Sequence, residues 1–285
     1  MEQFRYSTVK TLVQAAVYFL LFLAGDLGSS VVFDGIFSAV SLPSSEWYVI
    51  FRMAGSLLLT LLFFWLYTTR CLHLEMADFW ITFGVKKWGV ILSVLLPAFV
   101  VAIFLMLGEL EVNAVGCGDA VLAVAASAMI ALKSGILEEM LFRGFMMKLL
   151  AVRWNPYIAI LVPSFVFGLV HIPAMESFTV GGVALLVASG TMVGVMFSLA
   201  AYQGKSVSNS ALMHAIWNFV MITSVLHITI AQGAYGSPLF QITIPPDNIL
   251  VTGGGFGIEA SFIALVGYVL VCAVLLIQAK RTVSG

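Results

Sequence analysis

Charged residues are scarce in this sequence: Asp, Glu, Lys and Arg together make up 9% of its 285 residues. The formal net charge of −1 provides no basic field that would attract a polyanion, so we expect no nucleic-acid partner. Long runs of like charge are also missing, which argues against a solvated, disordered tail.

Cysteines are few as well. The three in the chain, Cys71, Cys117 and Cys272, are scattered and show no C-x-x-C spacing. They therefore indicate neither a thiol nucleophile nor a thiolate zinc site. We interpret all three as apolar packing residues.

Apolar residues, in contrast, make up 61% of the chain, and the mean hydropathy is +1.08. They recur in runs of about twenty residues, the length a helix needs to cross a bilayer. The sequence therefore predicts an all-α polytopic membrane protein. We expect about eight transmembrane helices, near residues 12–33, 47–68, 88–107, 119–150, 156–172, 179–202, 207–231 and 258–279.

Basic residues predict the orientation of these spans. Lys and Arg gather at alternate connections, namely residues 5–10, 70–87, 148–153, 205 and 280–281. Under the positive-inside rule, this pattern places both termini in the cytoplasm. Asp26 interrupts the first span and no clear cleavage site follows, so we interpret that span as a retained anchor.

Two connecting segments have a distinct character. Residues 73–87 mix aromatic and charged positions too closely to span, so we expect them to lie along the cytoplasmic interface. Residues 232–257 are rich in Gly and Pro and should form the longest extracytoplasmic loop. Because no repeat or linker is visible, we predict a single membrane domain, 1–285.

Three ionisable residues interrupt the fourth apolar stretch: Glu138, Glu139 and Arg143. Charges at membrane depth are costly unless they pair or line a wet cavity, so they indicate a functional site. Glu139 and Arg143 stand four residues apart on one helical face, where they can neutralise each other. Glu138 points about 100° away from Glu139, which leaves it free to face a cavity.

The next stretch adds a histidine at matching depth. Trp154-Asn155-Pro156 lies midway between Glu138 and His171, and an Asn-Pro pair favours a turn. A hairpin that closes there puts both residues roughly 22 Å from the turn, so their side chains can meet.

His214 and Asn218 form another pair four residues apart, in the seventh stretch. His214 reaches the depth of Glu138 if the hairpin tip extends about 10 Å into the cytoplasm. The helix that carries His171 then stops short, so residues 173–178 must complete the crossing irregularly or be buried.

Three further ionisable residues, and one pair of glycines, lie on or beside these stretches. Lys133 lies inside the same stretch as Glu138 and should need an anionic partner, which the sequence does not identify. We expect His73, at the interface, and His227, in the outer half of the seventh span, to lie outside the site. Gly190-x-x-x-Gly194 permits close helix contact with a neighbour from this chain or from another.

The residues alone leave two mechanisms of hydrolysis open for these Glu, His and Asn side chains. One is hydrolysis of a peptide bond by water that a carboxylate and an imidazole activate, with donors for the oxyanion. The other is metal-assisted hydrolysis, in which Glu138, His171 and His214 bind Zn²⁺ and leave a position for water. An HExxH helix is missing, which weakens the second alternative.

Three motifs in this order, on late spans of an eight-span protein, resemble the CAAX protease and bacteriocin-processing (CPBP, or Abi) family of intramembrane endopeptidases, of the Ras-converting CAAX prenyl protease type. They are Glu138-Glu139-x-x-x-Arg143, Phe167-x-x-x-His171 and His214-x-x-x-Asn218. The resemblance covers roughly 119–220, which would be the catalytic core.

The resemblance implies a role for each motif residue. Glu138 and His171 would activate the attacking water, and His214 and Asn218 would stabilise the oxyanion. The supporting residues would be Glu139, Arg143 and Phe167. It also implies a mechanism with no obligatory metal, although Zn or another divalent metal remains the alternative.

The implied partners are membrane lipid and a peptide or protein substrate, which is prenylated in one branch of the family. The expected location is the cytoplasmic membrane of a prokaryote or the endoplasmic reticulum of a eukaryote, with the site open to the cytoplasm. Other functions considered are a non-proteolytic scaffold or bacteriocin-immunity protein of the same family, and an ion-coupled transporter. A transporter usually shows inverted repeats and paired broken helices, which the sequence does not.

Overall fold

The computed structural model describes residues 6–40, 44–230, 238–245 and 248–284. Helices dominate this part of the chain, as predicted. They are α1 (Thr8–Ala39), α2 (Ser45–Leu66), α3 (Lys87–Leu107), α4 (Cys117–Glu139), α5 (Met147–Arg153), α6 (Pro156–Val170), α7 (Val180–Gly204), α8 (Ser208–Met221), α9 (Ile249–Thr252) and α10 (Phe262–Ser284).

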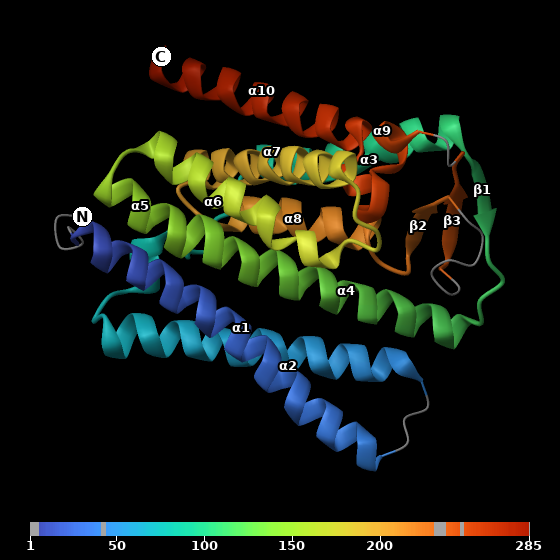
Figure 1. Ribbon diagram of the computed structural model, residues 1–285, viewed down its shortest axis with the longest axis horizontal. Helices are drawn as coiled ribbons and strands as arrows, with labels where there is room; N and C mark the ends of the chain where they lie inside the picture. The colour runs from blue at the N-terminus through green and yellow to red at the C-terminus, as the bar shows by residue number, and fades with distance from the viewer. Residues whose placement is uncertain (1–5, 41–43, 231–237, 246–247, 285) are drawn as a thin grey trace.

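The long helices run side by side along the long axis of the molecule (Figure 1). Helices α1 and α2 form an antiparallel pair on one flank, and α10 lies on the other. The start of α1 and the end of α10 lie at the same end of the bundle. The short helix α8 contacts α3, α4 and α7, so it occupies the interior.

Seven helices in the described part of the chain are long and apolar enough to cross a membrane. Large apolar side chains such as Leu20, Leu58 and Leu95 stay exposed on them, as expected for surfaces that contact lipid. The protein is therefore an integral membrane protein built from helices. Helix α1, at 32 residues, is longer than the predicted span 12–33.

The seventh predicted span, 207–231, is wrong in its second half. Helix α8 ends at Met221 after 14 residues, or about 21 Å, which is too short to cross a hydrocarbon core of about 30 Å. The chain then turns into a strand, β2 (Leu226–Thr229), so His227 lies in that strand and not in a span. Polar residues along α8 explain its position inside the bundle.

A small sheet, which the sequence did not predict, covers one end of the bundle, opposite the end where the chain begins (Figure 1). Strand β3 (Phe240–Thr243) is central, with β1 (Glu109–Val112) antiparallel on one side and β2 parallel on the other. Part of the predicted loop 232–257 thus forms β3, α9 and short 3₁₀ turns. Residues 232–237 and 246–247 of this loop lie outside the described residues.

Residues 73–87 do not form a span, in agreement with the prediction. They contain a 3₁₀ turn, Met76–Phe79, followed by extended chain that packs on the start of α8. The carbonyl oxygen of Thr82 accepts hydrogen bonds from Ser206 Oγ at 2.7 Å and Ser208 Oγ at 2.6 Å. This segment therefore fixes the first turn of the buried helix that carries His214.

Candidate active site

The helix that carries the two glutamates changes its winding at the site. Helix α4 ends at Glu139 and continues without interruption through a π-helical segment, Met140–Met146, into α5. A π-helical turn takes in an extra residue and alters the direction of the side chains that follow; such segments are frequent at functional sites. The sequence predicted a helix here but not this change.

Glu139 and Arg143 form the predicted ion pair. Arg143 Nη1 donates to Glu139 Oε1 at 2.8 Å, and neither side chain has any exposed surface. Arg143 Nη2 also donates to the carbonyl oxygen of Gly194, at 3.1 Å, and the guanidinium lies 4.6 Å from the ring centroid of Phe167. The pair thus holds the helix of α4 and the π-helical segment against α6 and α7, and Phe167 packs on the guanidinium.

His214 connects the two glutamates. Its Nδ1 lies 3.0 Å from Glu139 Oε1, and its Nε2 lies 3.9 Å from Glu138 Oε2. Since a carboxylate that is paired with an arginine accepts hydrogen bonds, Nδ1 is the donor. The ring also stacks on Phe197, with centroids 4.8 Å apart. The sequence predicted only Arg143 as a partner of Glu139 and did not predict the hydrogen bond from His214.

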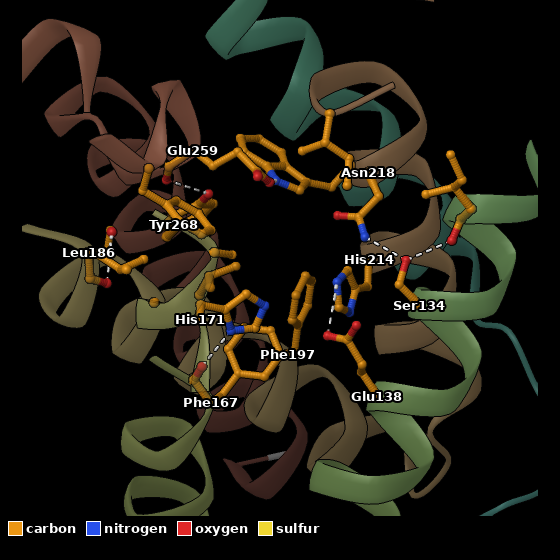
Figure 2. A pocket seen from close by; sticks show the side chains of 18 of the residues that line it. Ser134, Glu138, Phe167, His171, Leu186, Phe197, His214, Asn218, Glu259 and Tyr268 are labelled. Atoms are coloured by element: carbon orange, nitrogen blue, oxygen red, sulfur yellow. Dashed lines mark hydrogen bonds and ion pairs between the residues drawn. The ribbon is translucent and has the colours of Figure 1, made fainter. Parts of the chain in front are cut away.

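His171 faces Glu138 and His214 across a cavity (Figure 2). It follows the last residue of α6, and its Nδ1 lies 2.6 Å from the carbonyl oxygen of Phe167. A carbonyl only accepts, so Nδ1 donates, and in a neutral ring Nε2 then carries a lone pair. Figure 2 shows His171 on one side of a cavity, with Glu138 and His214 on the other.

Asn218 lies one turn beyond His214 on α8. Its Nδ2 donates to Ser134 Oγ at 2.8 Å, and Ser134 Oγ donates in turn to the carbonyl oxygen of Ile130 at 2.8 Å (Figure 2). An amide nitrogen carries two hydrogens, so one N–H of Asn218 is still available to a substrate.

These side chains surround a cavity of about 300 Å³, which lies in the lower range for small-molecule sites. Its walls are mainly apolar. The predicted residues that line it are Glu138, Phe167, His171, His214 and Asn218. Glu139 and Arg143 lie behind this wall, which agrees with their predicted supporting position, and His73 and His227 do not line the cavity, as expected.

Small residues allow the helices to approach closely enough to form this site. A Cβ atom on Gly135 of α4 would lie 2.8 Å from Ala215 Cβ, so only glycine allows α8 to pack there. A Cβ atom on Gly190 would lie 2.8 Å from Gly168 Cα, and one on Gly194 2.8 Å from Ser164 Cα. The neighbour of Gly190-x-x-x-Gly194 is therefore α6 of the same chain.

The hairpin between α5 and α6 forms where the sequence predicted it. Asn155 begins α6, and its Oδ1 accepts a hydrogen bond from the backbone N–H of Ile158 at 3.0 Å. After His171 the chain makes a 3₁₀ turn, Ile172–Ala174, and stays irregular up to α7. Residues 175–178 thus form no helix, which agrees with the irregular alternative expected for 173–178.

The structure adds a carboxylate that the sequence reasoning missed. Glu259 lines the cavity, and its Oε1 accepts a hydrogen bond from Trp217 Nε1 at 2.6 Å. Tyr268 also lines the cavity and donates to the backbone oxygen of Glu259 at 3.1 Å. Glu259 falls at the start of the predicted span 258–279, so the rule that selected Glu138 could have selected it too.

Lys133 finds its anionic partner on α1. Its Nζ lies 2.9 Å from Asp26 Oδ1, and Arg52 Nη2 of α2 lies 3.7 Å from Asp26 Oδ2. Ser56 Oγ also donates to Asp26 Oδ1, at 2.8 Å. The aspartate that interrupts the first span therefore serves as a counter-ion for a residue of the cavity wall, since Lys133 lines the cavity.

A metal ion needs several donor side chains close together. Within the described ranges, no three His, Cys, Asp or Glu side chains gather closely enough to hold one. Glu138, His171 and His214 share the cavity but lie on opposite walls (Figure 2). As arranged here, they do not form the ligand set that the sequence left as an alternative.

Residues 120–220 match the family model described as Rce1-like: Type II CAAX prenyl endopeptidase Rce1-like. No curated protein and no solved structure matches the chain. The matched segment runs from α4 to the end of α8 and contains all seven of the predicted site residues. It supports a family assignment of CPBP/Rce1 type.

Proposed function

With the Rce1-like match of residues 120–220 as the premise, we propose that this protein is an intramembrane endopeptidase acting on membrane-associated substrates. We propose removal of the C-terminal tripeptide from prenylated CAAX proteins as its specific reaction. The observation that carries the proposal is the placement of His214 between Glu138 and Glu139, at a cavity that His171 faces from the other wall.

Glu138 and His171 are placed to activate water between them. The carboxylate of Glu138 and the lone pair on His171 Nε2 can both accept a proton. The two groups line the same cavity, which leaves space for a substrate between them. In the proposed step, Glu138 takes a proton from the water, whose oxygen forms a bond to the scissile carbonyl carbon. The carbonyl π electrons move to its oxygen.

His214 and Asn218 are placed to stabilise that oxyanion. In the proposed mechanism, Nδ1 of His214 donates to Glu139 and Nε2 carries the N–H that meets the substrate. Its Nε2 is 3.9 Å from Glu138, too long for a hydrogen bond, which leaves this N–H for the oxyanion. The second N–H of Asn218 is the other donor.

Collapse of the tetrahedral intermediate completes the reaction. The C–N bond breaks, its electron pair goes to the leaving nitrogen, and the proton held by Glu138 passes to that nitrogen. No step requires a metal ion in this scheme, since protein groups supply both the base and the oxyanion donors. As the nitrogen leaves, the oxyanion re-forms the C=O bond, and the acid so formed releases its remaining proton to the amine, so the products are a new carboxylate and an ammonium group.

The surroundings of the cavity suit a lipidated substrate. Its walls are apolar, and helices with exposed apolar surface flank it. The basic residues predict that the α5–α6 turn faces the cytoplasm. The membrane would be the cytoplasmic membrane of a prokaryote or the endoplasmic reticulum of a eukaryote.

The test is cleavage of a prenylated CAAX peptide by purified protein in detergent. Wild type, Glu138→Gln and the control Glu109→Gln, which alters an exposed acid in β1, are compared with and without a strong chelator. We expect wild type and Glu109→Gln to cleave equally and to resist chelation, and Glu138→Gln to lose at least a thousandfold in rate. Cleavage by Glu138→Gln at the wild-type rate would contradict the proposal, and chelator-sensitive cleavage would assign the chemistry to a metal.

A further inference from the structure

A charged cluster with more positive than negative charge lies beside the cavity, and its member Lys133 lines the cavity wall. Lys133 and Arg52 both approach the single carboxylate of Asp26, at 2.9 Å and 3.7 Å. The three side chains are only 15%, 28% and 32% exposed, respectively, so water screens them weakly. Asp34, farther along α1, is exposed and bonded to Ser30 and Tyr48. One cationic charge in the cluster therefore lacks an anion in direct contact.

The cluster can also offer hydrogen bonds to an anion. Arg52 Nε is buried and has no hydrogen-bond partner among the described residues. Lys133 carries three N–H donors, of which Asp26 takes one. Ser56 Oγ also donates to Asp26 Oδ1, the oxygen that Lys133 contacts, so this oxygen already has two partners. An added anion would thus meet donors and a net positive charge, at membrane depth where an unbalanced charge is costly.

The distance from Glu138 fits a short peptide terminus. Lys133 lies five residues before Glu138 on α4, which is about 7.5 Å along the helix axis, and the lysine side chain extends this reach. Three residues of extended chain cover about 10 Å. A tripeptide whose scissile bond sits at Glu138 therefore brings its terminal carboxylate within reach of Lys133 Nζ.

The opposite wall carries a buried carboxyl group. Ser134, the neighbour of Lys133 along α4, lies across the cavity from Glu259 (Figure 2). Glu259 provides no positive charge, whereas Lys133 does, so the Lys133 side is the one that attracts a substrate carboxylate.

We propose that Lys133, together with Arg52 and Asp26, forms a subsite for the C-terminal carboxylate of the substrate. The protein would then select peptides by their free C-terminus and release a short C-terminal fragment. This inference rests on the proposed endopeptidase function, which it deepens by adding an anionic terminus to the substrate class.

The experiment measures binding in a Glu138→Gln background, so that it does not depend on turnover. A fluorescent prenylated peptide that ends in a free carboxylate is compared with the same peptide ending in an amide. We expect the acid to bind about tenfold more tightly, which corresponds to about 1.4 kcal/mol. Addition of Lys133→Gln should reduce the ratio to about one, whereas Lys133→Arg should keep it.

Two further variants sharpen the result. Asp26→Asn removes the competing anion and should raise the acid-to-amide ratio above that of the Glu138→Gln protein. Lys87→Gln, an exposed lysine at the start of α3, should leave the ratio unchanged. Because Lys133→Arg and Asp26→Asn keep a cation in place, they test the subsite even if Lys133→Gln fails to fold.

Equal binding of acid and amide, or no binding of either, would overturn the subsite. Competition by short-chain phosphatidylglycerol that requires Lys133, and that a zwitterionic lipid does not reproduce, would assign the cluster to lipid headgroups and also overturn it. Failure of wild type to cleave either peptide would instead contradict the endopeptidase function, and the binding ratio would remain as a separate result.

Discussion

Loss of Arg143 should destabilise the protein more than loss of any other single charge. In Arg143→Met, Glu139 keeps only its bond from His214, and the carbonyl oxygen of Gly194 keeps only its side-chain bond from Ser198 Oγ. Both members of the pair are fully buried, and removal of one partner from such a pair costs about 3–5 kcal/mol. For a chain of this size, this corresponds to a fall in Tm of roughly 10 °C.

A double-mutant cycle isolates the pair. Glu139→Gln removes the charge but keeps an acceptor for His214, so the double variant Glu139→Gln/Arg143→Met has no unpaired charge. It should be more stable than the sum of the two single changes predicts, by about 2 kcal/mol. The measurement is unfolding in detergent, followed by circular dichroism, with Arg70→Met on the exposed end of the segment after α2 as control. Additive effects, or single changes no larger than that of Arg70→Met, would refute the reasoning.

Three smaller changes test the packing around the site. Gly135→Val pushes α8 away from α4 and should cost about 1–3 kcal/mol of stability while lowering kcat, as thermal unfolding and peptide kinetics would show; wild-type values for both would contradict the close packing. Ser134→Ala frees the amide of Asn218 and should lower kcat about tenfold, or by about 1.4 kcal/mol, with little change in KM; a change in KM alone would argue against a role in the transition state. Trp217→Phe leaves the carboxylate of Glu259 without its donor and should cost about 1–3 kcal/mol in an unfolding assay, whereas an unchanged midpoint would show that this bond adds no stability.

Local spacing was the most successful guide to this structure. Four-residue spacing within one helix predicted the ion pair of Glu139 with Arg143, because positions four apart share a helical face whatever the rest of the fold does. The turn at Asn155 followed from the residues that begin helices. Counting residues from that turn then placed Glu138 and His171 at one cavity.

Contacts between distant segments were harder to predict. The pairing of Lys133 with Asp26 joins α4 to α1, and no spacing rule relates two positions so far apart. The bond from His214 to Glu139 depends on the approach of α8 to Gly135, which is set by packing. The rule that an acid at membrane depth indicates a functional site also applies to Glu259, but from the sequence this residue was included only as part of an apolar span.

Hydropathy misjudged α8 for a physical reason. The window 207–231 is apolar because α8 packs inside the bundle and Leu226 and Ile228 of β2 are buried in the sheet that covers its end, not because these residues contact lipid. An apolar composition indicates that a segment is buried, but segments buried in protein and segments buried in lipid have the same composition. A 14-residue helix inside the bundle and a full span therefore give similar profiles.

The most direct test of the central claim is hydrolysis of a prenylated CAAX peptide in H₂¹⁸O, with the products read by mass spectrometry. The account predicts that the wild-type protein puts one ¹⁸O atom into the new carboxylate of the lipidated fragment and releases an unlabelled tripeptide, and that Glu138→Gln yields neither product. Equal product from Glu138→Gln, verified as folded, would contradict it.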